Sequence, residues 1–496
     1  MSSNRKRLGQ FFTPSNVASS LVKWVAPSPS TRLLDPSCGD GAFLRHHKKS
    51  VGIELDPAQA WQARENAPSA LVHCGDFFVW AGKTRERFEA IAGNPPFIRY
   101  QSFSGAARAQ ALAAASLMGG DFSALTSSWA PFILVSAGLL KPGGRMAFVV
   151  PAEIGHANYA KVLIEALCCH FSDVHVVACR RKLFPEISED CWLLSCHGFG
   201  GRTEAIRLTS VDDFVPASVP PDADRTVALS EWRSMGGRLR PFLLPAKSLE
   251  LYQQLTEAAE VRRFGDLAFA NIGYVSGANE FFHLRPSEAR QLGIPKEVLS
   301  VTIRKASQLP KGSVGHADIA RWIADDESVF LLNLKGVDPL PEPVRAYLSS
   351  ERAEEARKAY KCRSRLPWYS VPDVKVPDGF LTVMNGRTSA LVRNAAGCVC
   401  TNSLHAVRLR NGEDFRELQD GWESPLAELG AEIEGHPLGG GMLKLEPKEA
   451  ARIPIPGRRF RLSEGNRETL LLAIDKMREW RHCGARSTHA TISQPN

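Results

Sequence analysis

The 496-residue sequence contains no long apolar run. Its most hydrophobic stretches, such as residues 146–151, fall far short of the roughly 20 residues that cross a bilayer. Residues 1–10 are polar and basic, and they lack the apolar stretch of a secretory signal. These absences argue against a membrane or secreted protein and predict a cytoplasmic one.

Cysteine pairs with the spacing of a metal site are also missing. Eleven cysteines are scattered along the chain, and Cys398 and Cys400 stand too close together for the usual zinc chelate. We therefore expect reduced thiols and no metal. The formal net charge of +8 fits a polyanionic partner without requiring one.

Short β-branched runs alternate with helical stretches from residue 31 to about residue 199. The alternation predicts an α/β domain with a mostly parallel sheet. The seven expected strands are 32–35, 51–55, 70–73, 88–92, 145–150, 174–178 and 192–196.

The length of the chain indicates more than one domain. Proline and glycine interrupt the alternation between residues 216 and 237, which places the expected boundary within 205–245. The rest mixes helical pieces with short strands and turns. We therefore expect a first domain at 1–245, a second, α+β domain at 246–480 and a disordered tail at 481–496.

Acidic residues follow three successive expected strands. Asp35 precedes a turn at residues 36–41 whose glycines let the backbone pass close to a ligand, ahead of a helix N-terminus. Glu54 ends the next strand about 20 residues later, at the spacing that holds ribose hydroxyls in dinucleotide folds. Asp76 and Phe77 follow the third strand, where a carboxylate and a ring can bind an adenine. One such acid alone would indicate a turn or a cap, but the three together predict a nucleoside-bearing cofactor.

The tetrapeptide Asn94-Pro95-Pro96-Phe97 follows the fourth strand. Two consecutive prolines stiffen the backbone and remove N–H donors, leaving carbonyls that point outward. An amide beside such a carbonyl offers two acceptors for one NH₂ group, and Phe97 can stack on the base that carries it. Two hydrogen bonds to an exocyclic amine favour a more pyramidal and more nucleophilic nitrogen. An isolated Pro-Pro would indicate only a rigid loop.

The order of these motifs resembles that of the TaqI-type, gamma-class DNA adenine-N6 methyltransferases of type II restriction–modification systems. The motifs are Gln10-Phe11-Phe12-Thr13-Pro14, residues 35–43, Glu54, Asp76-Phe77 and residues 94–97. The resemblance implies a class I S-adenosylmethionine-dependent methyltransferase (Rossmann-like) domain, α/β in class, followed by an α+β target-recognition domain. It also implies that S-adenosyl-L-methionine is the cofactor and double-stranded DNA the substrate.

The resemblance gives each cofactor-binding residue a role. Thr13, Asp35, Gly39 and Gly41 would line the amino-acid end of the cofactor. Glu54 would hold its ribose hydroxyls. The implied cofactor-binding residues are Thr13, Asp35, Gly39, Gly41, Glu54, Asp76, Phe77 and Asn94.

The catalytic residues come from the same resemblance. Asn94 and the Pro95 carbonyl would hold the target amine, and Phe97 would stack on the flipped base. Phe184, in Leu183-Phe184-Pro185, matches a second aromatic residue that packs on the base. Phe97 stands where some members carry tyrosine, and stacking needs no hydroxyl.

Three later segments, 273–282, 400–405 and 439–447, resemble landmarks of the family's target-recognition region. The resemblance leaves room for a separate cognate restriction endonuclease as a partner, and few residues precede the first motif, so we expect no cleavage activity in this chain. Candidates for contacts to DNA are Arg304, Lys305, Arg363, Arg365, Arg387 and Arg393, although each alone is as well explained as a solvated charge.

Two alternatives remain open from the residues alone. The same tetrapeptide serves enzymes that methylate an RNA base or a protein glutamine amide, which would explain residues 10–200 but not the second half. A DNA-binding relative without catalysis is disfavoured by the intact Glu54, Asp76 and Asn94.

Overall fold

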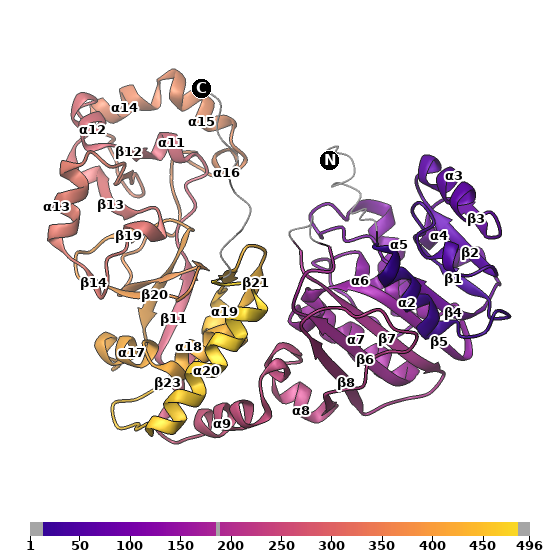
Figure 1. Ribbon diagram of the computed structural model, residues 1–496. Coiled ribbons are helices and arrows are strands. Elements are labelled where there is room, and N and C mark those ends of the chain that lie inside the picture. The colour runs from indigo at the N-terminus through magenta and orange to yellow at the C-terminus, as the bar shows by residue number, and fades with distance from the viewer. Residues whose placement is uncertain (1–12, 185–188, 485–496) are drawn as a thin grey trace, which may run out of the picture. The chain divides into compact units, whose positions relative to one another are not determined.

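The computed structural model describes residues 13–184 and 189–484 (Figure 1). The chain divides into two compact units, residues 1–244 and 245–496. Residues 10–12 and Pro185 of the sequence motifs lie outside the described residues, as does most of the tail expected to be disordered. Across the described ranges, none of the helices has the length and apolar character needed to cross a membrane.

A nine-stranded sheet forms the centre of the first unit, in the order β3-β2-β1-β4-β5-β7-β6-β8-β9. The first five strands in this order are parallel, and β7 runs antiparallel between β5 and β6. All seven expected strands are present. The strands are β1 (Leu33–Asp35), β2 (Ser50–Glu54), β3 (Leu71–Cys74), β4 (Phe88–Gly93), β5 (Leu140–Pro151), β6 (Phe171–Cys179), β7 (Cys191–Phe199), β8 (Ala205–Val211) and β9 (Arg225–Ala228).

The last two strands lie within residues 205–245, the stretch in which the sequence predicts the domain boundary. Here β8 and β9 extend the sheet of the first unit, and the units divide after them, between residues 244 and 245. The proline-rich stretch is the loop between these two strands. In β8 the side chains of Ile206 and Leu208 are buried, so this segment belongs to the core rather than to a linker.

Helices cover the sheet of the first unit because their apolar residues gather on faces that pack against it. In α2 the apolar side chains pack in one cluster with Ala90, Ala147 and Val149 of the sheet. All nine residues of α6 are buried, which fits its apolar sequence. The helices are α2 (Ser15–Val25), α3 (Pro57–Asn66), α4 (Phe77–Lys83), α5 (Gly105–Ser116), α6 (Trp129–Ala137), α7 (Asn158–His170) and α8 (Leu229–Ser234).

The second unit is built from several small sheets, of which the largest has the order β11-β20-β16-β18-β14. Its strands are β10 (Val261–Arg263), β11 (Ala268–Ile272), β12 (His283–Leu284), β13 (Leu299–Ile303), β14 (Ser313–Val314), β15 (Phe330–Leu332), β16 (Gly379–Thr382), β17 (Met384–Asn385), β18 (Leu391–Asn394), β19 (Val399–Cys400), β20 (Leu404–Leu409), β21 (His436–Leu438), β22 (Met442–Lys444) and β23 (Pro454–Pro456). Short, mostly antiparallel sheets beside separate helices make this unit α+β, as expected.

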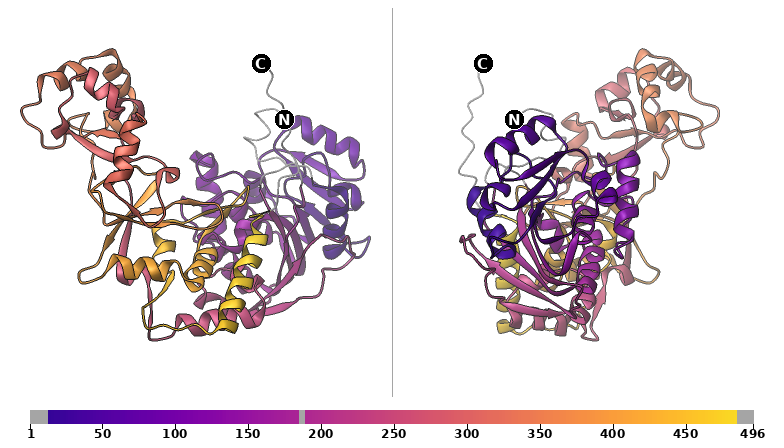
Figure 2. Two further views of the ribbon diagram at one scale, coloured as in Figure 1. Left: turned by 60° about the vertical axis from the view of Figure 1, so that its left-hand side comes forward. Right: turned by 90° about the vertical axis from the view of Figure 1, so that its right-hand side faces the viewer.

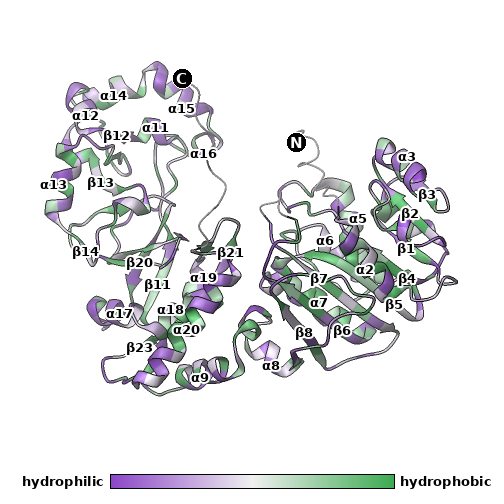
Figure 3. Cartoon of the chain, viewed as in Figure 1, coloured by the Kyte–Doolittle hydropathy of each residue, from purple (hydrophilic) through white to green (hydrophobic). Residues whose placement is uncertain are grey.

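The helices of the second unit are α9 (Ala246–Thr256), α10 (Phe264–Leu267), α11 (Asn279–Phe282), α12 (Pro286–Gln291), α13 (His316–Ala324), α14 (Glu342–Leu348), α15 (Glu351–Lys358), α16 (Tyr360–Arg363), α17 (Phe415–Trp422), α18 (Pro425–Glu434), α19 (Pro447–Ala450) and α20 (Glu464–Trp480). Within this unit, α11, α12 and α14 to α16 form a lobe at the end away from α18 and α20 (Figure 2). In Figure 3 the strands of the first unit's sheet are largely hydrophobic, whereas α3 and α15 are largely hydrophilic.

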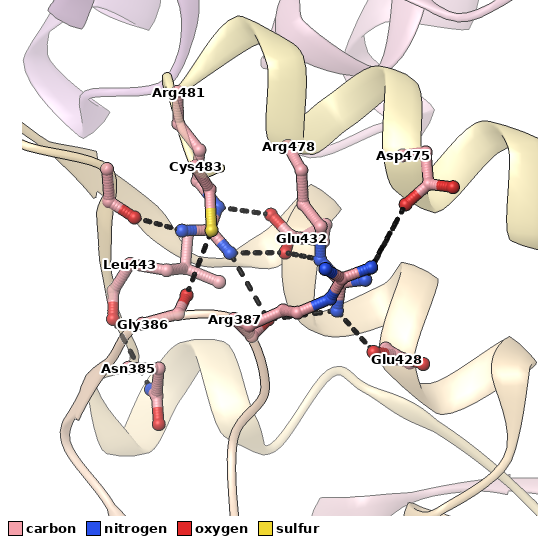
Figure 4. Close-up of polar contacts among 11 residues, drawn as sticks. Asn385, Gly386, Arg387, Glu428, Glu432, Leu443, Asp475, Arg478, Arg481 and Cys483 are labelled. Atoms are coloured by element: carbon pink, nitrogen blue, oxygen red, sulfur yellow. Dashed lines mark hydrogen bonds and ion pairs between the residues drawn. The ribbon is translucent and has the colours of Figure 1, made fainter. Parts of the chain in front are cut away.

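A buried charge network holds the end of α20 against α18 (Figure 4). The Arg481 guanidinium donates to Glu432 from Nη2 at 2.7 Å and from Nε at 2.8 Å, and both side chains are almost fully buried. Arg478 donates to Glu432 at 3.3 Å and to the Arg387 carbonyl at 2.9 Å. Arg481 also donates to the Gly441 carbonyl. The network therefore fixes two turns of the second unit as well as two helices.

Candidate functional site

The predicted site residues meet where parallel strands end. Asp35 and Glu54 are the last residues of β1 and β2, and Asp76 and Asn94 come shortly after β3 and β4. The carboxyl ends of adjacent parallel strands form one edge of a sheet, which is where α/β proteins bind ligands. A cavity of about 290 Å³ lies at this edge. Its lining includes Thr13, Gly39, Glu54, Asp76, Phe77 and Asn94, but not Asp35, Gly41, Pro95, Phe97 or Phe184.

Glycines shape the turn between β1 and the cavity. Gly39 and Gly41 have φ angles of 54° and 88°, a left-handed conformation that favours glycine. A Cβ atom on Gly41 would also lie 3.2 Å from the Ala63 backbone in α3. The turn is thereby held close to α3, and its Gly39 amide donates to Glu54 Oε2 at 2.9 Å.

Glu54 is held by the backbone on both of its oxygens. Oε2 accepts from Gly39, and Oε1 accepts from the Asp56 amide at 2.8 Å. Burial raises the pKa of this carboxyl, and the two backbone donors partly offset that effect. Each carboxylate oxygen can accept a second hydrogen bond, so the group is oriented and still able to bind hydroxyls.

Asp35 is a fully buried carboxyl behind the cavity wall. Its Oδ1 accepts from the Ser37 amide at 3.2 Å, whereas Oδ2 is buried and has no hydrogen-bond partner among the described residues. Burial raises the pKa of Asp35 well above its usual value. Burial thus favours the neutral carboxyl, and a nearby cation would stabilise its ionised form. The residues present therefore fit a ligand that carries a positive charge.

Asp76 and Phe77 begin α4 beside the cavity. Asp76 Oδ1 accepts from the Val79 amide at 3.0 Å and so caps the helix. The Phe77 ring is 5% exposed and packs 4.4 Å from the Phe132 ring. Leu55, which the sequence analysis did not single out, is 59% exposed and also lines the cavity. This part of the wall is therefore apolar, with one carboxylate at its edge.

The loop of residues 94–98 is fixed by three hydroxyl groups. The Asn94 amide donates from Nδ2 to Thr13 Oγ1 at 3.2 Å. Ser37 Oγ donates to the Asn94 carbonyl at 3.0 Å. Ser128, at the start of α6, donates to the Pro96 carbonyl at 2.5 Å and accepts from the Ile98 amide at 3.0 Å.

Two of these bonds lie on either side of the Pro95 carbonyl. The Asn94 carbonyl is bound by Ser37 and the Pro96 carbonyl by Ser128. Within the described ranges, no hydrogen bond reaches the Pro95 carbonyl between them. The Pro95 carbonyl is thus a backbone acceptor next to an amide side chain whose donor end is fixed on Thr13.

The two residues predicted to stack on the target base, Phe97 and Phe184, pack beside this loop. Phe97 is partly buried and packs against an apolar cluster that contains Phe184, which is 4% exposed. The structure therefore brings the two rings into one cluster, with Phe184 inside it rather than on the cavity wall. Their stacking role stays a prediction.

Three further residues, Leu55, Phe103 and Ser128, line the cavity and were not predicted from the sequence. Ser128 precedes an apolar helix, a position that is typical of a capping residue. Its side chain makes no cap hydrogen bond and binds the loop instead. No local pattern marks Leu55 or Phe103 as cavity residues.

Three protein-family models match the chain in succession. They are "N-6 DNA Methylase" at residues 1–63, "Eco57I restriction-modification methylase" at residues 46–177 and "Type II methyltransferase M.Eco57I, C-terminal domain" at residues 237–483. The last of these matches covers most of the second unit.

Curated relatives align over most of the chain. Type II methyltransferase M.XamI of Xanthomonas campestris pv. amaranthicola is 24% identical over 480 residues, covering 91% of this chain and 85% of the relative. Type II methyltransferase M.AccI of Acinetobacter calcoaceticus is 21% identical over 430 residues, covering 82% and 76%.

A solved structure supports the fold. The type IIL restriction–modification enzyme MmeI, in complex with DNA, has a TM-score of 0.55 at 12% identity, over 97% of this chain and 76% of that chain. The expected methyltransferase fold is confirmed, and membership of the gamma class stays a prediction. The successive family models and the relatives, which align over most of the chain, support an N6-adenine DNA methyltransferase of a type II restriction–modification system.

Proposed function

We propose that this protein binds S-adenosyl-L-methionine at the ends of β1 to β4 and methylates an adenine that has rotated out of a DNA duplex. Asn94 and the Pro95 carbonyl hold the N6 amine of that adenine. The proposal rests on which backbone carbonyls of this loop accept hydrogen bonds. The carbonyls on either side of Pro95 are bound by Ser37 and Ser128, whereas no described residue binds that of Pro95.

Catalysis rests on the two acceptors of this loop. The bond from Asn94 Nδ2 to Thr13 orients the amide, so its oxygen is the end that accepts from the amine. S-adenosyl-L-methionine supplies a methyl group on a positively charged sulfonium. As the amine nitrogen becomes cationic, the Asn94 and Pro95 oxygens stabilise its charge from fixed positions. The methylated ammonium is acidic and loses its proton to water, so the loop needs no strong base.

The cavity wall fits the cofactor in two ways. The buried Asp35 carboxylate, with one oxygen unpartnered in the described part of the chain, matches a ligand with a cationic amino-acid end. Glu54 is oriented by two backbone amides to accept hydroxyl protons, as a ribose would require. We assign Thr13, Gly39, Gly41, Asp76 and Phe77 to the same cofactor by the family resemblance.

We assign target recognition in double-stranded DNA to the second unit. Its match to a type II methyltransferase C-terminal domain and the DNA complex of MmeI support this assignment. Rotating the base out of the stack costs a few kcal/mol, which contacts of the second unit would offset. A separate restriction endonuclease that acts on the same site would complete the system.

The direct test is transfer of labelled methyl groups to unmethylated duplex DNA, with mass spectrometry of the product nucleosides. We expect N6-methyladenine from the wild-type protein and none from Asn94→Ala, with cofactor affinity in the variant within a few-fold of wild type. Equal loss of transfer and cofactor binding would contradict the role of Asn94.

RNA is the competing substrate in this test. The tRNA1(Val) (adenine(37)-N6)-methyltransferase of Actinobacillus succinogenes is 34% identical over 149 residues, although these are only 27% of this chain. Unmodified transfer RNA should therefore be assayed in parallel. Methylation of RNA with none of DNA would overturn the DNA proposal.

A further inference from the structure

The chain around α16 exposes apolar side chains on the lobe of the second unit. Tyr360, the first residue of α16, is 71% exposed, and Leu366, three residues after α16, is 99% exposed. Single exposed leucines are common on protein surfaces. The surroundings of Leu366 make this one unusual, because the turn that carries it is anchored on both sides.

Arg365 anchors the turn before Leu366. Its guanidinium donates to the Val275 and Ser276 carbonyls, each at 2.6 Å. Cys362, one turn earlier, is fully buried in the apolar cluster of the lobe. Gly277 allows this approach, since it has a φ of 88° and a Cβ there would lie 2.8 Å from Lys361 Cβ. Arg365 is therefore occupied in holding the turn, and we remove it from the candidates for DNA contacts.

Trp368 anchors the turn after Leu366. Its ring lies 5.4 Å from the Phe281 ring and 6.3 Å from the Phe282 ring, and both phenylalanines are buried. The Arg357 guanidinium lies 5.2 Å above the Trp368 ring. Leu366 is therefore exposed between two residues that are held in place. Burying its side chain in a partner costs little conformational entropy of the backbone.

The segment is rich in basic residues, of which Lys358 pairs with Glu355 of α15 at 2.7 Å. Residues 357–365 contain five arginine and lysine residues and no acidic residue. Lys361 and Arg363 are exposed, and in the part of the chain that the structure describes neither makes an ion pair. A cationic surface around an exposed leucine and tyrosine matches a polyanion with stacked apolar bases.

We propose that Leu366 is a wedge that inserts between base pairs of a DNA duplex, while Lys361 and Arg363 bind the flanking phosphates. This inference rests on the proposed DNA substrate. Leucine side chains inserted in this way partly unstack a base step and kink the duplex, and cationic neighbours fix their position.

The test compares Leu366→Ala with Leu472→Ala in the full-length protein. Leu472 is also exposed, at 65%, on α20 of the same unit, so both variants remove one exposed leucine side chain. Affinity for an unmethylated duplex of mixed sequence is measured by fluorescence anisotropy. Unwinding is measured by relaxing a closed circular plasmid with topoisomerase in the presence of the protein.

We expect Leu366→Ala to bind the duplex about tenfold more weakly and to unwind the plasmid less, with unchanged melting temperature and cofactor affinity. Leu472→Ala should match wild type in every measurement. A double variant, Lys361→Ala with Arg363→Ala, should reduce the slope of log affinity against log salt by about two.

Equal binding and unwinding by Leu366→Ala and wild type would overturn the wedge while leaving the proposed methyltransferase reaction intact. A wild-type protein that binds no duplex would overturn both proposals. A change of oligomeric state in Leu366→Ala, with DNA affinity unchanged, would assign the surface to a second copy of the chain and overturn the wedge.

Discussion

The Asn94 amide donates its Nδ2 proton to Thr13 Oγ1 at 3.2 Å, although the two residues are 81 positions apart in the sequence. Thr13 is buried and precedes α2, whereas Asn94 follows β4. The bond therefore connects the start of the described chain to the loop of residues 94–98. In the proposed mechanism, it orients the amide so that its oxygen accepts a hydrogen bond from the substrate amine.

Replacing Thr13 with valine removes this bond while keeping the shape of the side chain. We expect kcat to fall about tenfold, because the variant loses the bond that orients the Asn94 amide and the energy of one hydrogen bond corresponds to about a tenfold change in rate. Thr13→Ser, which keeps the hydroxyl, should recover most of the loss. Steady-state methyl transfer at saturating cofactor is the measurement, and a wild-type kcat in Thr13→Val would contradict the role of the bond.

Ser128 offers a second test, with a matched control in the same helix. Ser128→Ala removes the bonds to the Pro96 carbonyl and the Ile98 amide, so we expect the loop to loosen and kcat to fall by about a hundredfold. Ser136→Ala removes a bond to the Phe132 carbonyl, which lies within α6 and away from the loop.

Single-turnover methyl transfer and cofactor binding separate the two serine variants. Ser136→Ala should keep the wild-type rate, and Ser128→Ala should keep cofactor affinity within a few-fold. Equal losses of rate and of thermal stability in both variants would show that Ser128 serves only the packing of α6.

The strand ends of the site were predictable because the rule that places them is local. A short apolar run followed by an acid or amide puts that side chain at the edge of a parallel sheet, and Asp35, Glu54, Asp76 and Asn94 all lie there. Gly39 and Gly41 were predictable for a local reason too, because the turn requires positive φ angles, which favour glycine.

What escaped prediction depends on contacts between distant segments. Ser128 acts on a loop 32 residues away, and nothing in its own neighbourhood distinguishes it from a helix cap. Nothing in the sequence distinguishes Leu55 from any other single exposed leucine. Strands β8 and β9 were missed because the proline-rich loop between them resembles a linker, whereas their pairing with each other and with β6 makes them part of the sheet.

Asp35 makes the stability of the ligand-free protein depend on pH. Because burial raises its pKa in the folded state above the usual 3.8, the folded protein holds this proton more tightly than the unfolded chain. Its contribution to the free energy of unfolding therefore falls as the pH rises from about 4 towards the folded-state pKa. Asp35→Asn removes this dependence.

The measurement is the free energy of unfolding of wild type minus that of Asp35→Asn across pH 4 to 8, without cofactor. We expect this difference to decrease as the pH rises, and the variant to lose cofactor affinity at neutral pH. A difference that stays flat or increases over this range would contradict a buried carboxyl with a raised pKa.

The charge network of the second unit predicts that removing one negative charge lowers the stability of the unit strongly. Glu432 is 2% exposed and carries the negative charge that Arg481 and Arg478 share. Glu432→Gln leaves a buried guanidinium without its full counter-charge, which we expect to destabilise the unit by about 3 kcal/mol or more. Thermal unfolding of the full chain measures the effect.

Glu355→Gln is the matched control, because Glu355 pairs with Lys358 on the surface at 2.7 Å and exposed pairs contribute little. The control should have the same melting temperature as the wild-type protein. Glu432→Gln should also bind DNA more weakly, because the turns at Arg387 and Gly441 lose their anchor, while its cofactor affinity stays unchanged. Equal melting temperatures of the two variants would mean that Glu432 adds nothing to the fold and that the backbone carbonyls and Glu428 are enough to hold the arginines.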